Sequence, residues 1–242
     1  MKNLKDLTAV ILCGGKGLRI GELTAKVPKP LIEIGSKPIL WHVMKIFACQ
    51  GVKRFILCLG YRGKHIRDYF RKENKEGWDI RCINTGVDSL KSRRILQVEH
   101  LIKTDNFFLA YGDDVADINI NKLLSFHLQL KPYVTITTVR MSSDFGIVKT
   151  DNKHFVTEFS EKPVLNEWIN GGFMVMNKKV FDYLDEGELE KDIFNKFAKL
   201  EKICAYKHNG SWKAMNTLKD YMELNRMWKQ KQAFWNLWER KK

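Results

Sequence analysis

A glycine-rich loop with two cations stands near the start of the chain, and its composition suits the binding of phosphates. The loop follows a short apolar run and contains Gly14, Gly15, Lys16, Gly17 and Arg19. Glycines let the backbone approach a phosphate closely and turn its N–H groups toward the oxygens. The loop lacks the ending of a P-loop and the spacing of the dinucleotide-binding fingerprint. Taken alone, it indicates either a phosphate site or a tight turn.

A lysine between two prolines strengthens the phosphate interpretation. Lys29 follows the loop by about ten residues and is flanked by Pro28 and Pro30. The prolines restrict the backbone on both sides of the lysine, so the cation is held within a limited range of positions. A second lysine of this kind, Lys162, precedes a proline in the segment 161–163. We expect both lysines to hold phosphate groups.

Two adjacent carboxylates, Asp113 and Asp114, follow the apolar run 107–110. In open α/β sheets, ligands bind beyond the carboxyl ends of the strands. Mg²⁺ takes one or two carboxylates together with substrate phosphates and water. The pair therefore predicts a magnesium site, and an acidic turn whose aspartates cap a helix is the alternative. A polar turn at 170–172 precedes another buried run and suits hydrogen bonds to a hydroxylated ligand.

The elements that would position these residues alternate between strands and helices. Buried strands are predicted at 8–13, 54–59, 78–84, 107–110 and 172–176, and helices at 40–50, 65–72, 95–102, 121–130, 180–184 and 218–238. Two further segments, 145–150 and 154–159, are predicted to pair as strands. We expect one α/β domain over residues 1–242, with a Rossmann-like (GT-A-like) mixed, largely parallel sheet flanked by helices. It carries a small β-rich insertion and a C-terminal helical stretch whose aromatic residues pack in the core or against another subunit.

Composition narrows the class of protein. Hydrophobic residues make up 44% of the 242 residues and charged residues 29%, which is ordinary for a soluble globular chain. No apolar run approaches the roughly 20 residues that span a bilayer, and the run 7–13 has no cleavage site. The five cysteines lie in or beside apolar stretches and form no metal-binding spacing, so we expect buried, reduced thiols and no zinc. We predict a cytoplasmic protein with no membrane partner.

The net charge of +14 permits nucleic-acid binding, but the lysines are scattered along the chain and no RNA-stacking motif is present. A positive field would also steer polyanionic small molecules into a site. We therefore expect no nucleic-acid partner.

The order of motifs resembles that of the sugar-nucleotide pyrophosphorylases, a nucleotidyltransferase family, and within it the glucose-1-phosphate cytidylyltransferases. The motifs run along nearly the whole chain and are LCGGKGLR, PKPLIEIGSKPILWHVMKI, GYRG, YGDDVAD, FSEKP, INGGF and W-x-x-M-N-T. The resemblance implies that CMP is transferred from CTP to a phosphorylated acceptor, a sugar phosphate or a related small metabolite, with release of pyrophosphate. It also implies Mg²⁺ as cofactor and assembly into a homo-oligomer.

The resemblance also implies roles for individual residues. Catalysis would fall to Arg19, Lys29, Asp113 and Lys162. The nucleotide would be bound by Leu12, Gly14, Gly15, Lys16, Gly17, Arg19, Lys29, Ser92, Arg93 and Gly112. The acceptor would be bound by Tyr111, Glu161, Lys162, Asn170, Gly171, Gly172 and Trp212, and the metal by Asp113, Asp114 and Asn216.

Several positions depart from the family's pattern. Leu18 stands where a threonine is usual, and the segment before the third strand is short. The turn that reads Thr-Gly-Gly-Arg in relatives is 91–94 here, and its added cations predict an altered acceptor or nucleotide. Our hypothesis is an acceptor other than glucose 1-phosphate that carries an extra negative group. Asn216 replaces a metal-binding aspartate, so either Asp114 supplies the missing charge or Mg²⁺ binds weakly. A binding protein that has lost catalysis remains the alternative function.

Overall fold

The computed structural model describes residues 4–21, 23–185 and 187–239, without the side chains of Leu18, Ala25 and Lys26. Its centre is a seven-stranded sheet in the order β12-β8-β11-β6-β1-β4-β5. In this sheet β11 runs antiparallel to both neighbours, and the other adjacent pairs are parallel. The strands are β1 Thr8–Leu12, β4 Arg54–Leu59, β5 Asp79–Asn84, β6 Asn106–Tyr111, β8 Val134–Ser142, β11 Val164–Asn177 and β12 Ile203–Lys207.

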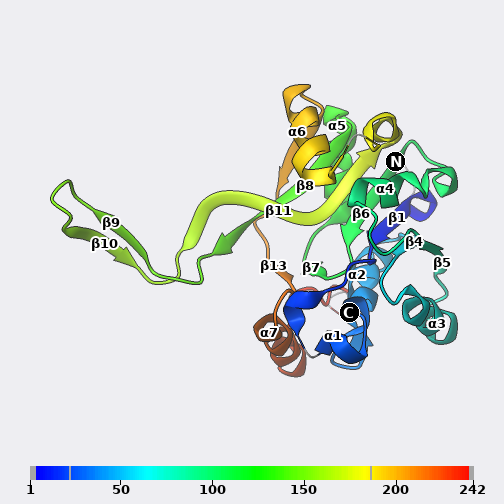
Figure 1. The fold of residues 1–242 in the computed structure, drawn as a ribbon, viewed down its shortest axis with the longest axis horizontal. Coiled ribbons are helices and arrows are strands. Elements are labelled where there is room, and N and C mark those ends of the chain that lie inside the picture. Colours follow the sequence, from blue (N-terminus) through cyan, green and yellow to red (C-terminus); the bar gives the residue numbers. More distant parts are fainter. Residues whose placement is uncertain (1–3, 22, 186, 240–242) are drawn as a thin grey trace.

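Helices cover both faces of the sheet because successive side chains of each buried strand point to opposite faces. Ala9 and Ile11 of β1 contribute to one hydrophobic cluster, and Val10 and Leu12 contribute to the other. The first cluster is completed by α2 Ile39–Ala48, α3 Gly63–Glu73, α5 Ile120–Leu130 and α7 Leu218–Lys229, and the second by α4 Lys91–Leu96 and α6 Phe194–Lys199 (Figure 1). The predicted fold class, an α/β fold with a mixed and largely parallel sheet, is confirmed.

Smaller elements complete the chain. The short strands are β2 Glu33–Ile34, β3 Lys37–Pro38, β7 Asp114–Ala116 and β13 Trp212–Ala214. The short helices are α1 Leu23–Lys26, η1 Leu4–Asp6, η2 Leu18–Ile20, η3 Lys29–Leu31, η4 Glu99–Leu101, η5 Lys178–Tyr183 and the π-helix η6 Leu189–Ile193. Among the described residues, no helix combines the length and the apolar character that crossing a membrane requires. The five cysteines are free thiols, as predicted, but only Cys13 and Cys58 are buried, and the other three are half-buried.

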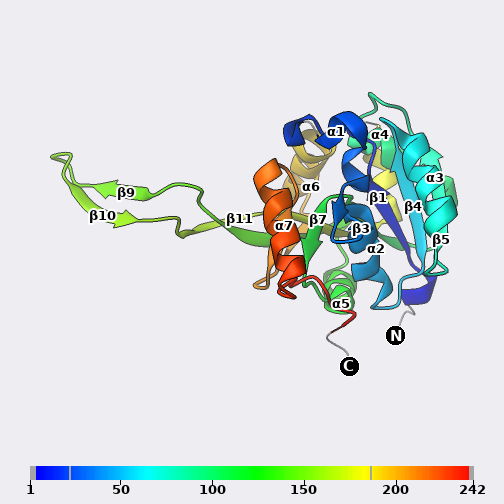
Figure 2. The same ribbon diagram turned by 90° about the horizontal axis from the view of Figure 1, so that it is seen from below.

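The predicted β-rich insertion is an arm that projects far from the body of the molecule (Figure 1, Figure 2). We call residues 143–163 the arm. It contains β9 Ile147–Thr150 and β10 Val156–Ser160, which pair with each other in antiparallel fashion and with no other strand. Several of its apolar side chains are exposed, and Phe145, Phe155 and Phe159 are 79%, 69% and 63% exposed.

The predicted long C-terminal helix is wrong in its extent. The helix α7 ends at Lys229, and the chain then turns back so that its tryptophans pack on α2. His42 of α2 is fully buried among them, and Trp228, Trp235 and Trp238 each contact its ring. The regular spacing of aromatic residues therefore reflects packing within the chain. It continues past the end of α7 because the segment after Lys229 packs on the same apolar surface of α2.

Two hydrogen bonds hold the buried His42 ring in its neutral form. Its Nε2 lies 2.9 Å from the carbonyl oxygen of Ile34, to which it donates. Its Nδ1 accepts from the indole N–H of Trp235 at 3.3 Å, which requires an unprotonated nitrogen. Burial lowers the pKa of His42 to about 4, because a charged imidazole is poorly solvated there.

We expect His42 to make folding stability pH-dependent. Its folded-state pKa lies below the unfolded value, so between pH 6.5 and 4 the unfolded chain binds a proton that the folded chain excludes. The free energy of unfolding therefore falls as the pH falls, by about 2–3 kcal/mol between pH 7 and pH 4.5 from this group alone. Urea unfolding of the wild type and of His42→Gln at both pH values checks this. An equal loss of stability in the two proteins would contradict it.

Candidate active site

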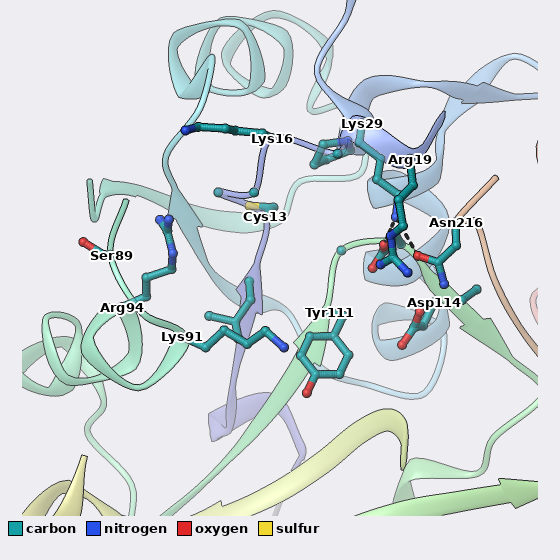
Figure 3. A pocket seen from close by; sticks show the side chains of 18 of the residues that line it. Cys13, Lys16, Arg19, Lys29, Ser89, Lys91, Arg94, Tyr111, Asp114 and Asn216 are labelled. Atoms are coloured by element: carbon teal, nitrogen blue, oxygen red, sulfur yellow. Dashed lines mark hydrogen bonds and ion pairs between the residues drawn. The ribbon is translucent and has the colours of Figure 1, made fainter. Parts of the chain in front are cut away.

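A cleft of about 670 Å³ opens where β1 and β6 end. The loop after β1 and the turn after β6 both line it, because parallel neighbours bring their carboxyl ends to the same edge of a sheet. Figure 3 shows the labelled side chains in two groups, with Lys16, Ser89 and Arg94 on one side and Tyr111, Asp114 and Asn216 on the other. We call these sides the loop end and the far end of the cleft.

The glycine-rich loop is packed against the lysine that the sequence analysis places beside it. Gly17 has a positive φ of 65°, and a Cβ built on it would lie 2.7 Å from the Cβ of Lys29. Any side chain at position 17 would therefore push the stem of Lys29 away. At the mouth of the cleft Lys16 forms an ion pair with Asp88 at 3.1 Å, and both side chains are largely exposed. An exposed pair of this kind contributes little stability and exchanges readily for a ligand.

Lys29 connects two of the predicted metal ligands. Its ammonium forms an ion pair with the carboxylate of Asp113 and donates a hydrogen bond to Oδ1 of Asn216 at 3.1 Å (Figure 3). The Lys29 side chain is only 11% exposed. A cation with so little contact with water interacts more strongly with nearby anions than one at the surface.

Local hydrogen bonds bring Asn216 to this position. The backbone N–H of Met215 donates to the carbonyl oxygen of Asp113 at 3.0 Å, which fixes the segment before α7 beside the turn after β6. Thr217 and Asp220 form a capping box that starts α7, and Asp220 also accepts from the backbone N–H of Asn216. Two segments about 100 residues apart in sequence thus deliver Asp113 and Asn216 to one ammonium group.

Asp114 points to a different place from Asp113. Its side chain lies against Gly172, where φ is +80° and where a Cβ would overlap the carboxylate. Burial raises the pKa of Asp114 well above its ordinary value, and the neighbouring charge of Asp113 raises it further. The two carboxylates therefore diverge, and only that of Asp113 forms an ion pair with Lys29.

A hydrogen-bonded group lies at the far end of the cleft. The hydroxyl of Tyr111 donates to Glu190 at 2.5 Å and accepts from the Asn170 amide at 3.3 Å. Lys91 forms an ion pair with the same Glu190 oxygen at 2.5 Å and lies over the Tyr111 ring. Burial raises the pKa of Glu190, but hydrogen bonds from Lys91 and Tyr111 outweigh it, so that pKa is lowered overall. Burial raises the pKa of Tyr111.

The turn 91–94 carries the predicted nucleotide contacts Ser92 and Arg93, and the structure does not bring them to the cleft. The hydroxyl of Ser92 donates to the carbonyl oxygen of Gly187, and Arg93 forms an ion pair with Asp185. Arg94 lines the cleft but donates to Leu59, Thr85 and Val87.

The other cation of this turn, Lys91, is paired with Glu190. The cations expected to recognise an additional negative group on the acceptor are therefore largely occupied by protein groups.

Glu161 and Lys162 lie where the arm meets the body, and neither lines the cleft. Their side chains are 62% and 60% exposed and lie 3.6 Å apart. The backbone N–H of Ser143 donates to the carbonyl oxygen of Pro163, and Asp144 forms an ion pair with Lys219 at the start of α7. These contacts hold the base of the arm near α7 while the two predicted substrate ligands face solvent.

Most of the predicted site residues do line the cleft, namely Leu12, Gly14, Gly15, Lys16, Gly17, Arg19, Lys29, Tyr111, Gly112, Asp113, Asp114, Asn170, Trp212 and Asn216. The lining does not include Ser92, Arg93, Glu161, Lys162, Gly171 and Gly172. The side chain of Leu18 lies outside the described residues. The lining also includes Lys91 and Arg94, two of the cations that the sequence analysis relates to the acceptor. It further includes residues that the sequence did not assign to the site, namely Cys13, Pro30, Val87, Asp88, Ser89 and Ala214. Of these, 87–89 follow β5, so the rule that sites form beyond strand ends could have identified them.

The donors around Lys29 fit a divalent cation that also binds a substrate. In the part of the chain that the structure describes, no group of three or more histidine, cysteine or acidic side chains forms a metal cage. Asp113 offers a carboxylate and Asn216 an amide oxygen, close enough to share one ammonium group. Mg²⁺ commonly uses one or two carboxylates and completes its shell with substrate phosphates and water.

Comparisons with known proteins agree with this geometry. A family model described as nucleotidyl transferase matches residues 8–231. The probable glucose-1-phosphate cytidylyltransferase of Bacillus subtilis (strain 168) is 41% identical over 96% of this chain and 100% of that protein. The glucose-1-phosphate cytidylyltransferase of Salmonella typhi is 36% identical over 96% and 100%. The crystal structure of HddC from Yersinia pseudotuberculosis is 25% identical, with a TM-score of 0.73 over 92% of this chain and 99% of that chain. The chain therefore belongs to the nucleotidyl transferase family.

Proposed function

We propose that this enzyme transfers CMP from CTP to a phosphorylated acceptor, a sugar phosphate or a related small metabolite phosphate, and releases pyrophosphate. The observation that carries the proposal is the placement of Lys29 between Asp113 and Asn216, beside the glycine-rich loop and at the carboxyl ends of β1 and β6. The choice of CTP and of a sugar phosphate follows from the relatives named glucose-1-phosphate cytidylyltransferase, which match along almost the whole chain.

In the proposed reaction a phosphate oxygen of the acceptor attacks the α-phosphorus of CTP. A new P–O bond forms there as the bond to the β-phosphate oxygen breaks, and the electron pair of that bond leaves with pyrophosphate. The attacking phosphate is already ionised, so no general base is needed. The protein's contribution is to align the two phosphates and to stabilise charge with Lys29 and the loop N–H groups.

The metal is part of this proposal. We infer that Asp113 and Asn216 hold Mg²⁺, which supplies charge neutralisation to the triphosphate when bound. We place the reaction in the cytoplasm, which the free thiols support. Glu161 and Lys162 stay predicted acceptor ligands, although they lie outside the cleft in this structure.

A matrix of nucleotides against phosphorylated acceptors tests the function. CTP, UTP, dTTP and GTP are each combined with glucose 1-phosphate, other sugar phosphates and polyol phosphates, and pyrophosphate release is measured. We expect the highest kcat/KM with CTP and a sugar phosphate. CTP binding without pyrophosphate release from any pair would instead support the alternative of a nucleotide-binding protein that has lost catalysis.

We also propose that the arm mediates assembly of a homo-oligomer. A two-stranded sheet standing alone is marginally stable in water, and this one exposes three phenylalanines. Every copy of the chain carries the same arm, so copies related by symmetry can bury it against one another. The C-terminal tryptophans, the other candidate contact, are already packed on α2 of their own chain.

Replacing the three arm phenylalanines, Phe145, Phe155 and Phe159, by serine should shift the protein to a smaller assembly. Light scattering after size-exclusion chromatography measures the mass in solution, and we expect it to fall to that of the monomer. The matched control is Leu200→Ser, since Leu200 is exposed at 46% but lies on the body. An unchanged mass in the triple variant would exclude the arm as the main contact.

A further inference from the structure

Asp114 is the one carboxylate lining the cleft that has no partner among the described residues. Asp88 forms an ion pair with Lys16, and Asp113 forms an ion pair with Lys29. Asp114 accepts no hydrogen bond and forms no ion pair within that part of the chain, although the residue is only 6% exposed. A buried carboxylate without a partner is costly, because it loses water and gains nothing in return. Such a group at the wall of a cleft points to a ligand that supplies the missing partner.

Small residues surround Asp114 in the wall of the cleft. On one side lies Gly172, whose positive φ and missing Cβ accommodate the carboxylate. Across the β7–β13 pair Asp114 stands opposite Ala214, another small residue of the cleft wall. Trp212 lies two residues from Ala214 and therefore on the same face of β13. An aromatic wall next to one buried polar group is the usual composition of a small-molecule site.

The charges at the far end favour an uncharged ligand group over an anion. The two lysines whose positive charges interact with Asp114 are Lys29 and Lys91. Lys29 is engaged by Asp113 and Asn216, and Lys91 is engaged by Glu190. An additional phosphate or carboxylate on the acceptor would thus find Lys29 and Lys91 already engaged by protein groups. A hydroxyl group needs no cation there and can form a hydrogen bond with Asp114.

We propose that Asp114 is a specificity-determining residue that accepts a hydrogen bond from a hydroxyl of the acceptor, and that the acceptor is a neutral hydroxylated molecule apart from its one phosphate. This inference rests on the proposed transfer to a phosphorylated acceptor. It assigns Asp114 to the acceptor and leaves the metal to Asp113 and Asn216, because the carboxylates of Asp113 and Asp114 diverge.

The test compares the wild type with Asp114→Ala on a panel of acceptors at saturating CTP. The panel contains glucose 1-phosphate, its four monodeoxy derivatives at carbons 2, 3, 4 and 6, glucosamine 1-phosphate and glucose 1,6-bisphosphate. With the wild type we expect one deoxy derivative to lose about 10- to 100-fold in kcat/KM, because a site built to bind a hydroxyl discriminates against its absence. In Asp114→Ala we expect kcat/KM for glucose 1-phosphate to fall by the same factor. The difference in kcat/KM between glucose 1-phosphate and that deoxy derivative should then vanish.

Two controls separate the acceptor from the other bound groups. The KM for CTP and the Mg²⁺ concentration at half-maximal rate should change less than about twofold in Asp114→Ala, since one hydrogen bond changes affinity about tenfold where it is made. Asp182→Ala, an exposed aspartate on η5, should match the wild type throughout.

Four results would overturn the inference: an unchanged deoxy profile in Asp114→Ala, a shift confined to the CTP KM, a shift confined to the Mg²⁺ dependence, or a wild-type preference for glucosamine 1-phosphate or the bisphosphate. If the wild type releases no pyrophosphate with any acceptor, the proposed function fails. In that case, calorimetry measures the affinity of the wild type and of Asp114→Ala for glucose 1-phosphate and its deoxy derivatives. If Asp114 binds a hydroxyl, one deoxy derivative should bind the wild type more weakly than glucose 1-phosphate does, and this difference should vanish in Asp114→Ala.

Discussion

The Lys29→Met variant should lose about 10³-fold in kcat/KM for pyrophosphate release. Methionine keeps the length of the apolar stem that packs against Gly17, so the loop keeps its shape while the ammonium is removed. Removing one fixed charge or donor that acts on a developing negative charge costs about 10²–10³-fold or more in comparable sites. The low exposure of Lys29 places it at the upper end of that range, since its field is poorly screened by water.

Steady-state kinetics with the best substrate pair measures this loss. Lys53→Met, which removes an exposed lysine remote from the cleft, is the matched control and should retain wild-type rates. Circular dichroism and a urea titration of Lys29→Met report whether the unpaired Asp113 also destabilises the fold. A kcat/KM within tenfold of the wild type would show that Lys29 serves the fold and not the reaction.

The second large effect concerns Asp113 and Asn216, which we expect to respond in opposite directions. Asp113→Asn should lower kcat/KM by about 10³-fold, because it removes the one carboxylate proposed for the metal and leaves two neutral amides. Asn216→Asp should lower the Mg²⁺ concentration at half-maximal rate by about tenfold, since a second carboxylate adds charge to the site.

Rates measured across a Mg²⁺ titration give both results from one experiment. Asp79→Asn, a change at the start of β5 and remote from the cleft, serves as the control for loss of an exposed carboxylate. A wild-type rate in Asp113→Asn, or an unaltered Mg²⁺ titration in Asn216→Asp, would remove these two residues from the proposed metal site.

The parts of the fold that follow from the sequence are those with strong local patterns. The strand at 54–59 and the helix at 121–130 are predicted to within about one residue, because each is a run of regular burial bounded by polar or turn residues. The prediction failed for β11, which is much longer than the apolar run 172–176. Its first half leaves the body and continues toward the arm, where no burial pattern marks it as a strand.

The site residues that directly follow a strand were predictable from the sequence. The loop after β1 and the turn after β6 are each one short stretch of sequence, and both lie at the same edge of the sheet. Gly14 and Asp113 were therefore assigned to one site. The engagement of Arg93 by Asp185 could not be foreseen, because it joins two turns through a tertiary contact with no sequence signature. The divergence of Asp113 and Asp114 depends likewise on Gly172, which comes from another strand.

The ion pair of Lys29 with Asp113 bears on the order in which ligands arrive. The ammonium of Lys29 neutralises the carboxylate of Asp113, so a lone divalent cation would have to displace a covalently tethered competitor. A triphosphate draws the ammonium toward its own oxygens and thereby frees the carboxylate. Nucleotide and metal should therefore bind as one complex. Without nucleotide, a change in the free magnesium concentration should not alter the occupancy of the metal site.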